Sequence, residues 1–158
     1  MLKLVSNNEE TTREIGRQVG SLTGEGTVIA LNGELGAGKT VLAKGVAEGL
    51  GVNEEIVSPT FIIMNVYRGR LALYHFDFYR LEEDDELQEL GLEEYFYGDG
   101  VALVEWASKF PGILPPDRLE IYLAKDQADP ESSRIISLET RGNFEAFKLE
   151  ELRKRCCF

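Results

Sequence analysis

The residues best suited to chemistry lie in one glycine-rich octapeptide, Gly33-Glu34-Leu35-Gly36-Ala37-Gly38-Lys39-Thr40. It has the form G-x-x-x-x-G-K-[ST], the phosphate-binding loop called Walker A. In such a loop the glycines let successive backbone N–H groups point inward at phosphate oxygens. Lys39 can then reach the β- and γ-phosphates of a nucleotide, and the Thr40 hydroxyl can ligate Mg²⁺. We therefore assign nucleotide binding to Glu34, Leu35, Gly36, Ala37, Gly38, Lys39, Thr40 and Val41.

The segments on either side of the loop support this assignment. Residues 27–32 form a short apolar run rich in β-branched residues, which predicts a strand. After the loop, Leu42, Val46 and Leu50 recur at helical spacing, which predicts a helix from about Lys39. The positive dipole end of that helix would face the phosphates. Strand, loop and helix in this order favour a phosphate site over the alternative, a glycine-rich turn without a ligand.

Two later carboxylates stand at the ends of predicted strands. Residues 101–105 read Val-Ala-Leu-Val-Glu, and Glu105 is our first choice for the acid that holds Mg²⁺ or its water shell together with Thr40. Asp77 follows the predicted strand 70–76, where it either shares the metal or positions and deprotonates an attacking water. An alternative for Asp77 is a surface carboxylate that caps the next helix. We assign metal binding to Thr40 and Glu105, and catalysis to Asp77 and Lys39.

The segment Ser58-Pro59-Thr60 supplies a further candidate for catalysis. Pro59 imposes an extended or turn conformation, so Thr60 is predicted to lie on a loop. From there Thr60 could sense the γ-phosphate or the metal, as switch residues do. His75, the only histidine, alternates with aromatic residues along a predicted strand, and we interpret it as a structural histidine.

The elements that must position these residues alternate between strands and helices. Further strands are predicted at residues 2–5, 61–67, 118–123 and 133–138, with a tight turn at Arg68-Gly69 that makes a hairpin. Asn7 or Asn8 is predicted to cap the first helix, and an acidic helix follows from Glu82. We predict an α/β fold of the P-loop NTPase type, a three-layer sandwich with a mainly parallel sheet and added antiparallel strands. With 158 residues, we expect one domain over 1–158.

The charge distribution argues against tight, autonomous binding of DNA or RNA. The net charge is −11, and the segment from Glu82 to Glu94 holds eight carboxylates and no lysine or arginine. Such a chain repels a nucleic-acid backbone, so we expect any nucleic-acid role to go through partners. The acidic segment is either a solvated helix face or a docking surface for a basic partner. The chain contains no N-K-x-D sequence of the kind that many GTPases use to read guanine, which favours ATP.

The chain also lacks the features of membrane and exported proteins. No apolar run is long enough to cross a bilayer, and the first residues do not form a signal peptide. The two cysteines, Cys156 and Cys157, are adjacent, so a fold-closing disulfide between them is not expected. We therefore expect a cytoplasmic protein.

Taken together, these motifs resemble the bacterial TsaE (YjeE/YdiB) family over almost the whole chain. The resemblance rests on five segments in a fixed order: Glu10-Thr11-Thr12, the octapeptide 33–40, Ser58-Pro59-Thr60-Phe61, His75-Phe76-Asp77-Phe78-Tyr79-Arg80-Leu81, and Val104-Glu105-Trp106. Generic ATPases do not share the later segments in this order after a Walker A loop.

The resemblance implies a small ATPase that uses ATP and Mg²⁺ in threonylcarbamoyl-adenosine formation on tRNA. It implies TsaB and TsaD as partners, contact with tRNA only through their complex, and slow hydrolysis alone that resets the complex. The metal positions would be Thr40 and Glu105, and Asp77 and Thr60 would serve hydrolysis. Residues near the nucleotide base would be Glu9, Thr12 and Arg134. We expect a monomer in isolation.

Two other classes of function stay open from the sequence. One is a small-molecule kinase of the nucleoside type, because Asp77 to Arg80 places an acid and an arginine as such kinases do. A kinase closes an arginine-rich lid over the phosphates. In this chain the candidate arginines are too far apart in the sequence to form such a lid: Arg118, Arg134 and Arg141. The other class is a binding module with negligible turnover, in which ATP only orders the loop around Thr60.

Overall fold

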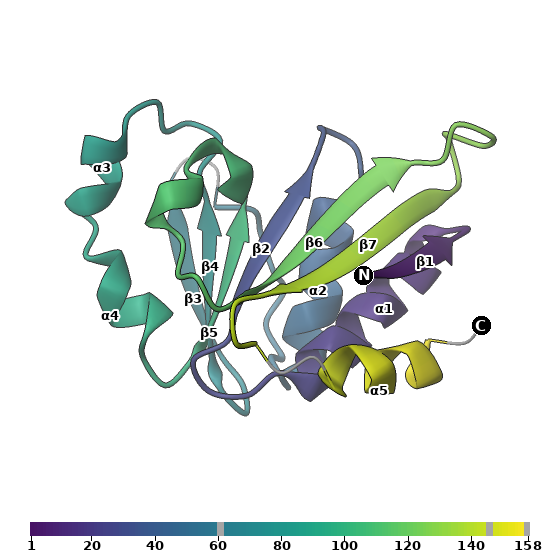
Figure 1. Cartoon of the computed structure of the whole chain (residues 1–158), viewed down its shortest axis with the longest axis horizontal. Coiled ribbons are helices and arrows are strands. Elements are labelled where there is room, and N and C mark those ends of the chain that lie inside the picture. The colour runs from purple at the N-terminus through teal and green to yellow at the C-terminus, as the bar shows by residue number, and fades with distance from the viewer. Residues whose placement is uncertain (60–61, 145–146, 157–158) are drawn as a thin grey trace.

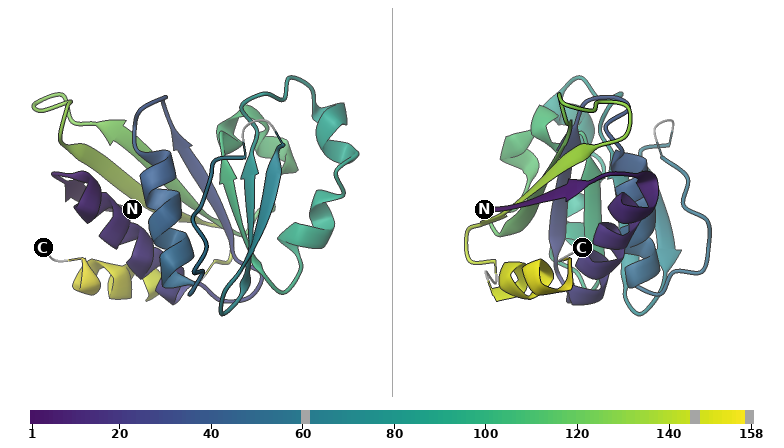
Figure 2. Two further views of the ribbon diagram at one scale, coloured as in Figure 1. Left: turned by 180° about the vertical axis from the view of Figure 1, so that it is seen from behind. Right: turned by 90° about the vertical axis from the view of Figure 1, so that its right-hand side faces the viewer.

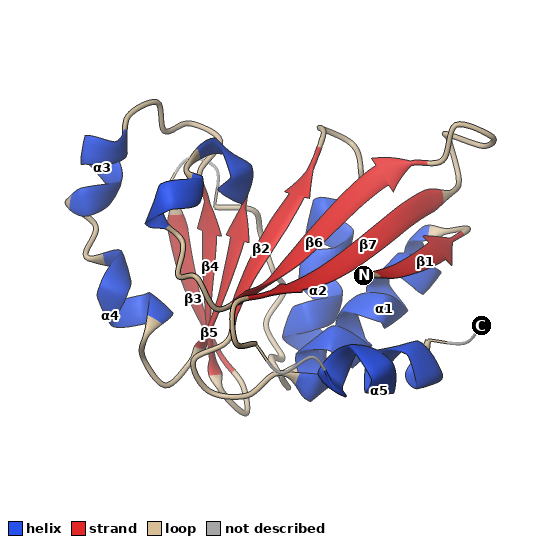
Figure 3. Ribbon diagram, viewed as in Figure 1, coloured by secondary structure: helices blue, strands red, loops and turns tan. Residues whose placement is uncertain are grey.

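Helices cover both faces of one mixed β-sheet (Figures 1 and 3). A computed structural model of the chain describes residues 1–59, 62–144 and 147–156. The strands are β1 (Leu2–Ser6), β2 (Val28–Gly33), β3 (Met64–Arg68), β4 (Ala72–Asp77), β5 (Val101–Glu105), β6 (Arg118–Lys125) and β7 (Arg134–Arg141). The helices are α1 (Glu9–Leu22), α2 (Lys39–Gly49), α3 (Asp84–Gln88), α4 (Leu92–Phe96) and α5 (Phe147–Arg155), with 3₁₀ turns η1 (Ala107–Lys109) and η2 (Pro111–Ile113).

The sheet is parallel in its centre and antiparallel at its edges. Among the described residues its order is β1-β7-β6-β2-β5-β4-β3. Strands β6, β2, β5 and β4 are parallel neighbours, whereas β7 runs antiparallel to β6 and β3 antiparallel to β4. The β3–β4 pairing confirms the predicted hairpin, but the turn is Gly69 to Leu71 rather than Arg68-Gly69, because Arg68 still pairs with Ala72. Because β2, β5 and β4 are parallel, their carboxyl ends meet at one edge of the sheet.

Two apolar clusters, one on each face, make this a three-layer fold. On one face α1, α2 and α5 pack on the sheet, with Ile29 and Leu31 of β2 in the core. On the other face Val28 and Ala30 join a cluster with α3, α4 and the segment around Phe110. Figure 2 shows α1 and α2 on one side of the sheet, with α5 at its lower end beside α1. The alternation along β2 follows from the two-residue period of a strand, and it confirms the predicted sandwich.

The predicted acidic helix is present but short. The helix expected from Glu82 is α3, which begins at Asp84 and ends at Gln88, and α4 follows it after Glu89 to Gly91. Gly91 has a φ of 64°, in the left-handed region that glycine adopts without strain, and it caps α4. Leu87 and Leu92 are thereby both turned into the core of this face. The break thus lets a segment with many carboxylates still bury apolar side chains.

Helix α1 approaches α2 closely because glycines line the contact. A Cβ placed on Gly16 would lie 2.9 Å from Cα of Gly45, and one placed on Gly49 would lie 2.8 Å from the backbone nitrogen of Ser21. Real Cβ contacts are longer than this. The two backbones therefore pack against each other, which ties the helix that follows the glycine-rich loop to α1.

We predict that Gly45→Ala destabilises the protein. The new methyl group meets the backbone of Arg13 and Gly16, which can retreat only if the helices separate. Overpacking of this kind costs about 1–3 kcal/mol, and alanine's better helix propensity returns only part of it. Urea unfolding measures the loss. Gly112→Ala is the matched control, because its Cβ would meet nothing within 4 Å. Equal stability of the two variants would contradict the close packing.

Candidate nucleotide-binding site

The glycine-rich loop joins the end of β2 to the start of α2, as the sequence predicts. Gly36 and Gly38 have φ angles of 79° and 102°, which other residues rarely adopt. Gly33 is required for another reason, since a Cβ there would lie 2.7 Å from the carbonyl oxygen of Leu123 on β6. A hydrogen bond of 3.1 Å from the N–H of Ala37 to the carbonyl of Glu34 closes the loop. The loop therefore has the curled backbone that a phosphate site needs.

Lys39, the first residue of α2, is held inside this loop. Its side chain is buried, and its ammonium donates to the carbonyl oxygens of Gly33 and Glu34, the latter at 3.0 Å. It also lies 4.2 Å from the centroid of the Trp106 ring, a cation–π contact. Burial lowers the pKa of Lys39 below its ordinary value, although the carboxylates of Glu105 and Asp77 favour the charged form. The ammonium is thus kept at the loop by carbonyls that a phosphate group can replace.

Asp77 and Glu105 lie side by side at the carboxyl ends of β4 and β5. The two residues are direct partners in the parallel register, and their side chains are only 3% and 2% exposed. One oxygen of Asp77 accepts from the N–H of Tyr79 at 2.9 Å, and the other accepts from the Ser58 hydroxyl at 3.2 Å. The alternative in which Asp77 is a surface cap of the next helix is wrong, because Asp77 is buried and α3 begins only at Asp84.

A cavity of about 380 Å³ brings the loop and the two carboxylates together. Its lining comes from the start of α1, from the loop and α2, from Ser58, and from the ends of β4 and β5 with the residues just after them. The residues are Glu9, Leu35, Gly36, Gly38, Lys39, Thr40, Val41, Ser58, Asp77, Tyr79, Glu105 and Trp106. Four of the predicted catalytic and metal-binding residues, Lys39, Thr40, Asp77 and Glu105, therefore face one space.

A second cavity, of about 290 Å³, adjoins the loop at the start of α1. It is lined by Glu9, Thr12 and Arg134 among others, the residues expected near a nucleotide base. Arg134 reaches the loop from β7 and donates to the carbonyl oxygens of Ala37 at 3.1 Å and Gly36 at 3.3 Å. Thr12 presents its methyl group to the loop, because its hydroxyl forms a buried 2.6 Å hydrogen bond with Ser6. Thr12 thus forms part of the cavity wall.

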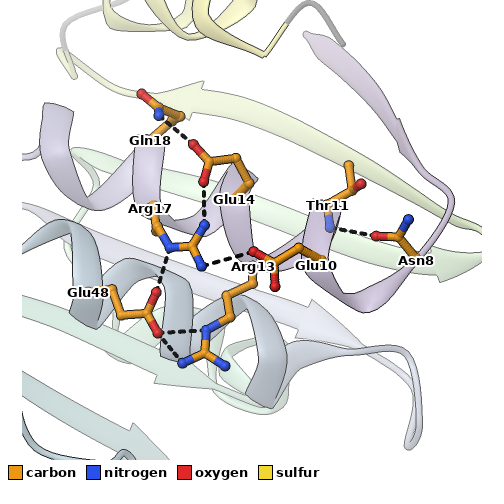
Figure 4. Close-up of polar contacts among 8 residues, drawn as sticks. All are labelled: Asn8, Glu10, Thr11, Arg13, Glu14, Arg17, Gln18 and Glu48. Atoms are coloured by element: carbon orange, nitrogen blue, oxygen red, sulfur yellow. Dashed lines mark hydrogen bonds and ion pairs between the residues drawn. The ribbon is translucent and has the colours of Figure 1, made fainter.

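An ion-pair cluster joins α1 to α2. Figure 4 shows Glu48 of α2 between Arg13 and Arg17 of α1. One carboxylate oxygen accepts from Nε of Arg13 and the other from Nε of Arg17, each at 2.6 Å. The hydrogen bonds from the two arginines lower the pKa of Glu48.

At the start of α1, Asn8 is the cap. Its side chain accepts from the N–H of Thr11 at 2.8 Å, which decides between the two predicted caps, Asn7 and Asn8.

Some residues of the site were not predicted, and one predicted residue is not described. Tyr79 and Trp106 line the larger cavity, with ring centroids 4.9 Å apart, and Ser58 contacts Asp77. Tyr79 and Trp106 follow the carboxylates that end β4 and β5, and this position in the sequence could have predicted that they line the site. Thr60 lies outside the described residues, so its role stays a prediction.

Comparison with known proteins identifies the family. The model of the family described as "Threonylcarbamoyl adenosine biosynthesis protein TsaE" matches residues 6–136. The chain belongs to the TsaE family. A relative from Bacillus subtilis strain 168, named tRNA threonylcarbamoyladenosine biosynthesis protein TsaE, is 45% identical over 152 residues, covering 96% of this chain and 93% of the relative. A relative of the same name from Treponema pallidum strain Nichols is 44% identical over 122 residues, covering 77% and 90%.

A solved structure with a similar sequence has this fold. The crystal structure of Bacillus subtilis YdiB superimposes with a TM-score of 0.83 at 39% sequence identity, covering 97% of this chain and 94% of that one. The resemblance inferred from the five segments is thereby confirmed, and so is the predicted P-loop NTPase-like fold.

Within the residues that the structure describes, no helix has the length and apolar character needed to span a membrane.

Proposed function

We propose that this TsaE-family chain is a Mg²⁺-dependent ATPase that acts with TsaB and TsaD in the threonylcarbamoyl-adenosine modification of tRNA. One observation supports the proposal most strongly: Lys39, Thr40, Asp77 and Glu105 line one cavity at the carboxyl ends of β2, β4 and β5. In open α/β sheets this edge is where ligands bind. The names of the relatives place them in the biosynthesis of threonylcarbamoyladenosine in tRNA.

The triphosphate of ATP fits the loop by charge and by space. The buried ammonium of Lys39 is bonded only to carbonyl oxygens among its hydrogen-bond partners in the described structure, and a phosphate oxygen is a stronger partner for it. The positive φ angles of Gly36 and Gly38 give the backbone a curled shape that a residue with a Cβ would adopt only with strain. We assign phosphate binding to the segment from Glu34 to Val41, with the base beside Glu9, Thr12 and Arg134.

Magnesium fits this site as a companion of the nucleotide. No group of three or more His, Cys, Asp or Glu side chains suited to a metal ion occurs within the described ranges. Mg²⁺ commonly uses one or two protein ligands together with phosphates and waters, so this absence agrees with a metal that arrives with ATP. Thr40 and Glu105 would hold it, and the metal would neutralise charge on the phosphates.

We infer that Asp77 acts on the attacking water. Tyr79 and Ser58 hold its two oxygens in a fixed orientation beside Glu105. A buried carboxylate so oriented can position a water molecule and accept its proton. Thr60, two residues after Ser58, would assist hydrolysis. We propose that hydrolysis is weak in the isolated chain and that it resets the complex with TsaB and TsaD in the cytoplasm.

The structure gives little support to a kinase lid. Arg118 bonds to Glu120 and to the carbonyl of Pro115, and Arg141 pairs with Glu139 on β7. Arg134 is bound to the glycine-rich loop itself. All three arginines lie in strands β6 and β7 rather than in a loop that could close over the phosphates. We therefore keep the kinase only as an alternative, which phosphorylation of a nucleoside would support.

The single tryptophan gives a direct test of nucleotide binding. Because the Lys39 ammonium lies over the Trp106 ring, we predict that its movement to the phosphates changes Trp106 fluorescence when ATP and Mg²⁺ are added. Calorimetric titration of Trp106→Phe is the control, since that variant loses the signal but keeps the loop. No fluorescence change and no heat of binding at millimolar ATP would refute the proposal.

Hydrolysis is then measured with and without purified TsaB and TsaD, with tRNA present. We expect stimulation by the partners. Stimulation absent under all conditions would favour the binding module. Phosphorylated nucleoside, after incubation with ATP and a nucleoside panel, would favour the kinase.

A further inference from the structure

The carboxylate of Glu105 is bonded to a second buried side chain, His75. Nε2 of His75 lies 2.7 Å from Oε2 of Glu105, and the side chains are 0% and 3% exposed. His75 belongs to β4 and Glu105 to β5, so neighbouring strands supply the two groups. This contact was not predicted from the sequence, where His75 was interpreted as a structural residue of the core.

The register of the sheet determines the contact. Asp77 is the direct partner of Glu105, and His75 is the direct partner of Leu103. Because side chains two residues apart point to the same face of a strand, His75 and Asp77 flank Glu105 on one face. A single strand thus presents two side chains to Glu105. Asp77 faces the cavity with it, and His75 binds it from within the core.

The hydrogen bonding of His75 is one-sided. An ionised carboxylate only accepts hydrogen bonds, so Nε2 is the nitrogen that carries the proton toward Glu105. The other ring nitrogen, Nδ1, is buried and has no hydrogen-bond partner within the part of the chain that the structure describes. A buried polar atom without a partner costs stability. An apolar residue at position 75 would avoid that cost, so core packing alone does not account for this histidine.

We propose that His75 is a positioning residue for the metal site. Its Nε2–H holds Oε2 of Glu105 and leaves the other carboxylate oxygen available to Mg²⁺ beside Thr40. A hydrogen bond of this kind fixes the orientation of a metal-binding carboxylate before the metal arrives, and its loss commonly lowers metal affinity about 10–100-fold. The inference rests on the proposed role of Glu105 in binding Mg²⁺, and it concerns how tightly the metal is held.

The test separates metal affinity from folding and from nucleotide binding. Wild type, His75→Leu and His75→Gln are compared by calorimetric titration with ATP in EDTA and at increasing Mg²⁺, and by electron paramagnetic resonance of Mn²⁺ bound with ATP. We expect His75→Leu to bind metal-free ATP within about threefold of wild type. The metal concentration at half-saturation should rise about 10–100-fold. His75→Gln, whose amide can still donate to Glu105, should recover much of the affinity.

A matched control addresses the possibility of a purely structural effect. Leu73→Val alters the same strand on the same face at a fully buried position, where Leu73 pairs with Val101, four residues before Glu105. It should lower the melting temperature and leave the metal dependence unchanged. In a double-mutant cycle, Glu105→Gln should abolish the further effect of His75→Leu, because the histidine acts through the carboxylate.

The results distinguish the positioning role of His75 from the proposed metal site. Wild-type metal affinity in folded His75→Leu, or additive effects in the cycle, would refute the positioning role and leave the proposed function intact. Wild-type protein that binds ATP without any Mg²⁺ dependence would instead refute the proposed metal site. If His75→Leu does not fold, His75→Gln decides: we expect its metal affinity to fall between that of wild type and that of Glu105→Gln, and an affinity equal to that of Glu105→Gln would refute the role.

Discussion

Lys39→Met abolishes tight ATP binding while the protein stays folded. The ammonium of Lys39 is the buried cation held at the loop, and a charge-assisted bond to phosphate is about twice as strong as a neutral one. We expect an affinity loss of roughly 100-fold or more, equivalent to about 2.7 kcal/mol. Calorimetric titration with ATP and Mg²⁺ measures it.

The same substitution should not destabilise the free protein. Burial lowers the pKa of Lys39, so folding penalises its charged form. The charged form therefore lowers the free energy of unfolding at neutral pH. This penalty is lost only as the pH rises toward the ordinary pKa range of lysine, where the side chain loses its proton. Methionine removes the charge and keeps the chain length, so we expect a melting temperature at or above that of wild type.

Lys44→Met is the matched control for Lys39→Met. Lys44 lies on the same helix, five residues further along, and does not line the larger cavity. It should bind ATP like wild type. Unchanged affinity in folded Lys39→Met would show that the loop is not the triphosphate site.

Asp77→Asn keeps ATP binding and loses turnover. Asparagine has nearly the same shape, and its side-chain oxygen can still accept from the N–H of Tyr79. It cannot accept a proton from water, a role that contributes about 10²–10⁴-fold in rate. We expect the hydrolysis rate in the presence of TsaB and TsaD to fall by at least about 100-fold, with ATP affinity within a few-fold of wild type.

This experiment also separates the two roles left open for Asp77. If Asp77 shares the metal, Asp77→Asn should raise the Mg²⁺ concentration needed for binding. If it acts on the water, that concentration should not change. Asp99→Asn, the same substitution at an exposed position before β5, is the control. Wild-type turnover in Asp77→Asn would remove Asp77 from the proposed mechanism.

The glycine-rich loop could be predicted because its requirements are local. Positive φ angles at Gly36 and Gly38 and the lysine that begins α2 are properties of adjacent residues. The hairpin of β3 and β4 was likewise predictable, because a short turn sets its pairing. The helices of the acidic segment were harder to predict. Gly91, in the left-handed region, separates α3 from α4, and the burial of Leu87 and Leu92 stabilises this arrangement.

The arrangement of the site was decided by tertiary structure. Asp77 and Glu105 are adjacent because β4 pairs in parallel with β5, and the same register places His75 against Glu105. Arg134 reaches the loop only because β7 lies beside β6 in the sheet. Local sequence specifies the conformation of a few consecutive residues through their φ preferences and side-chain chemistry. Strand order and register depend on the burial of apolar faces across the whole sheet, so only the folded chain determines which distant residues meet.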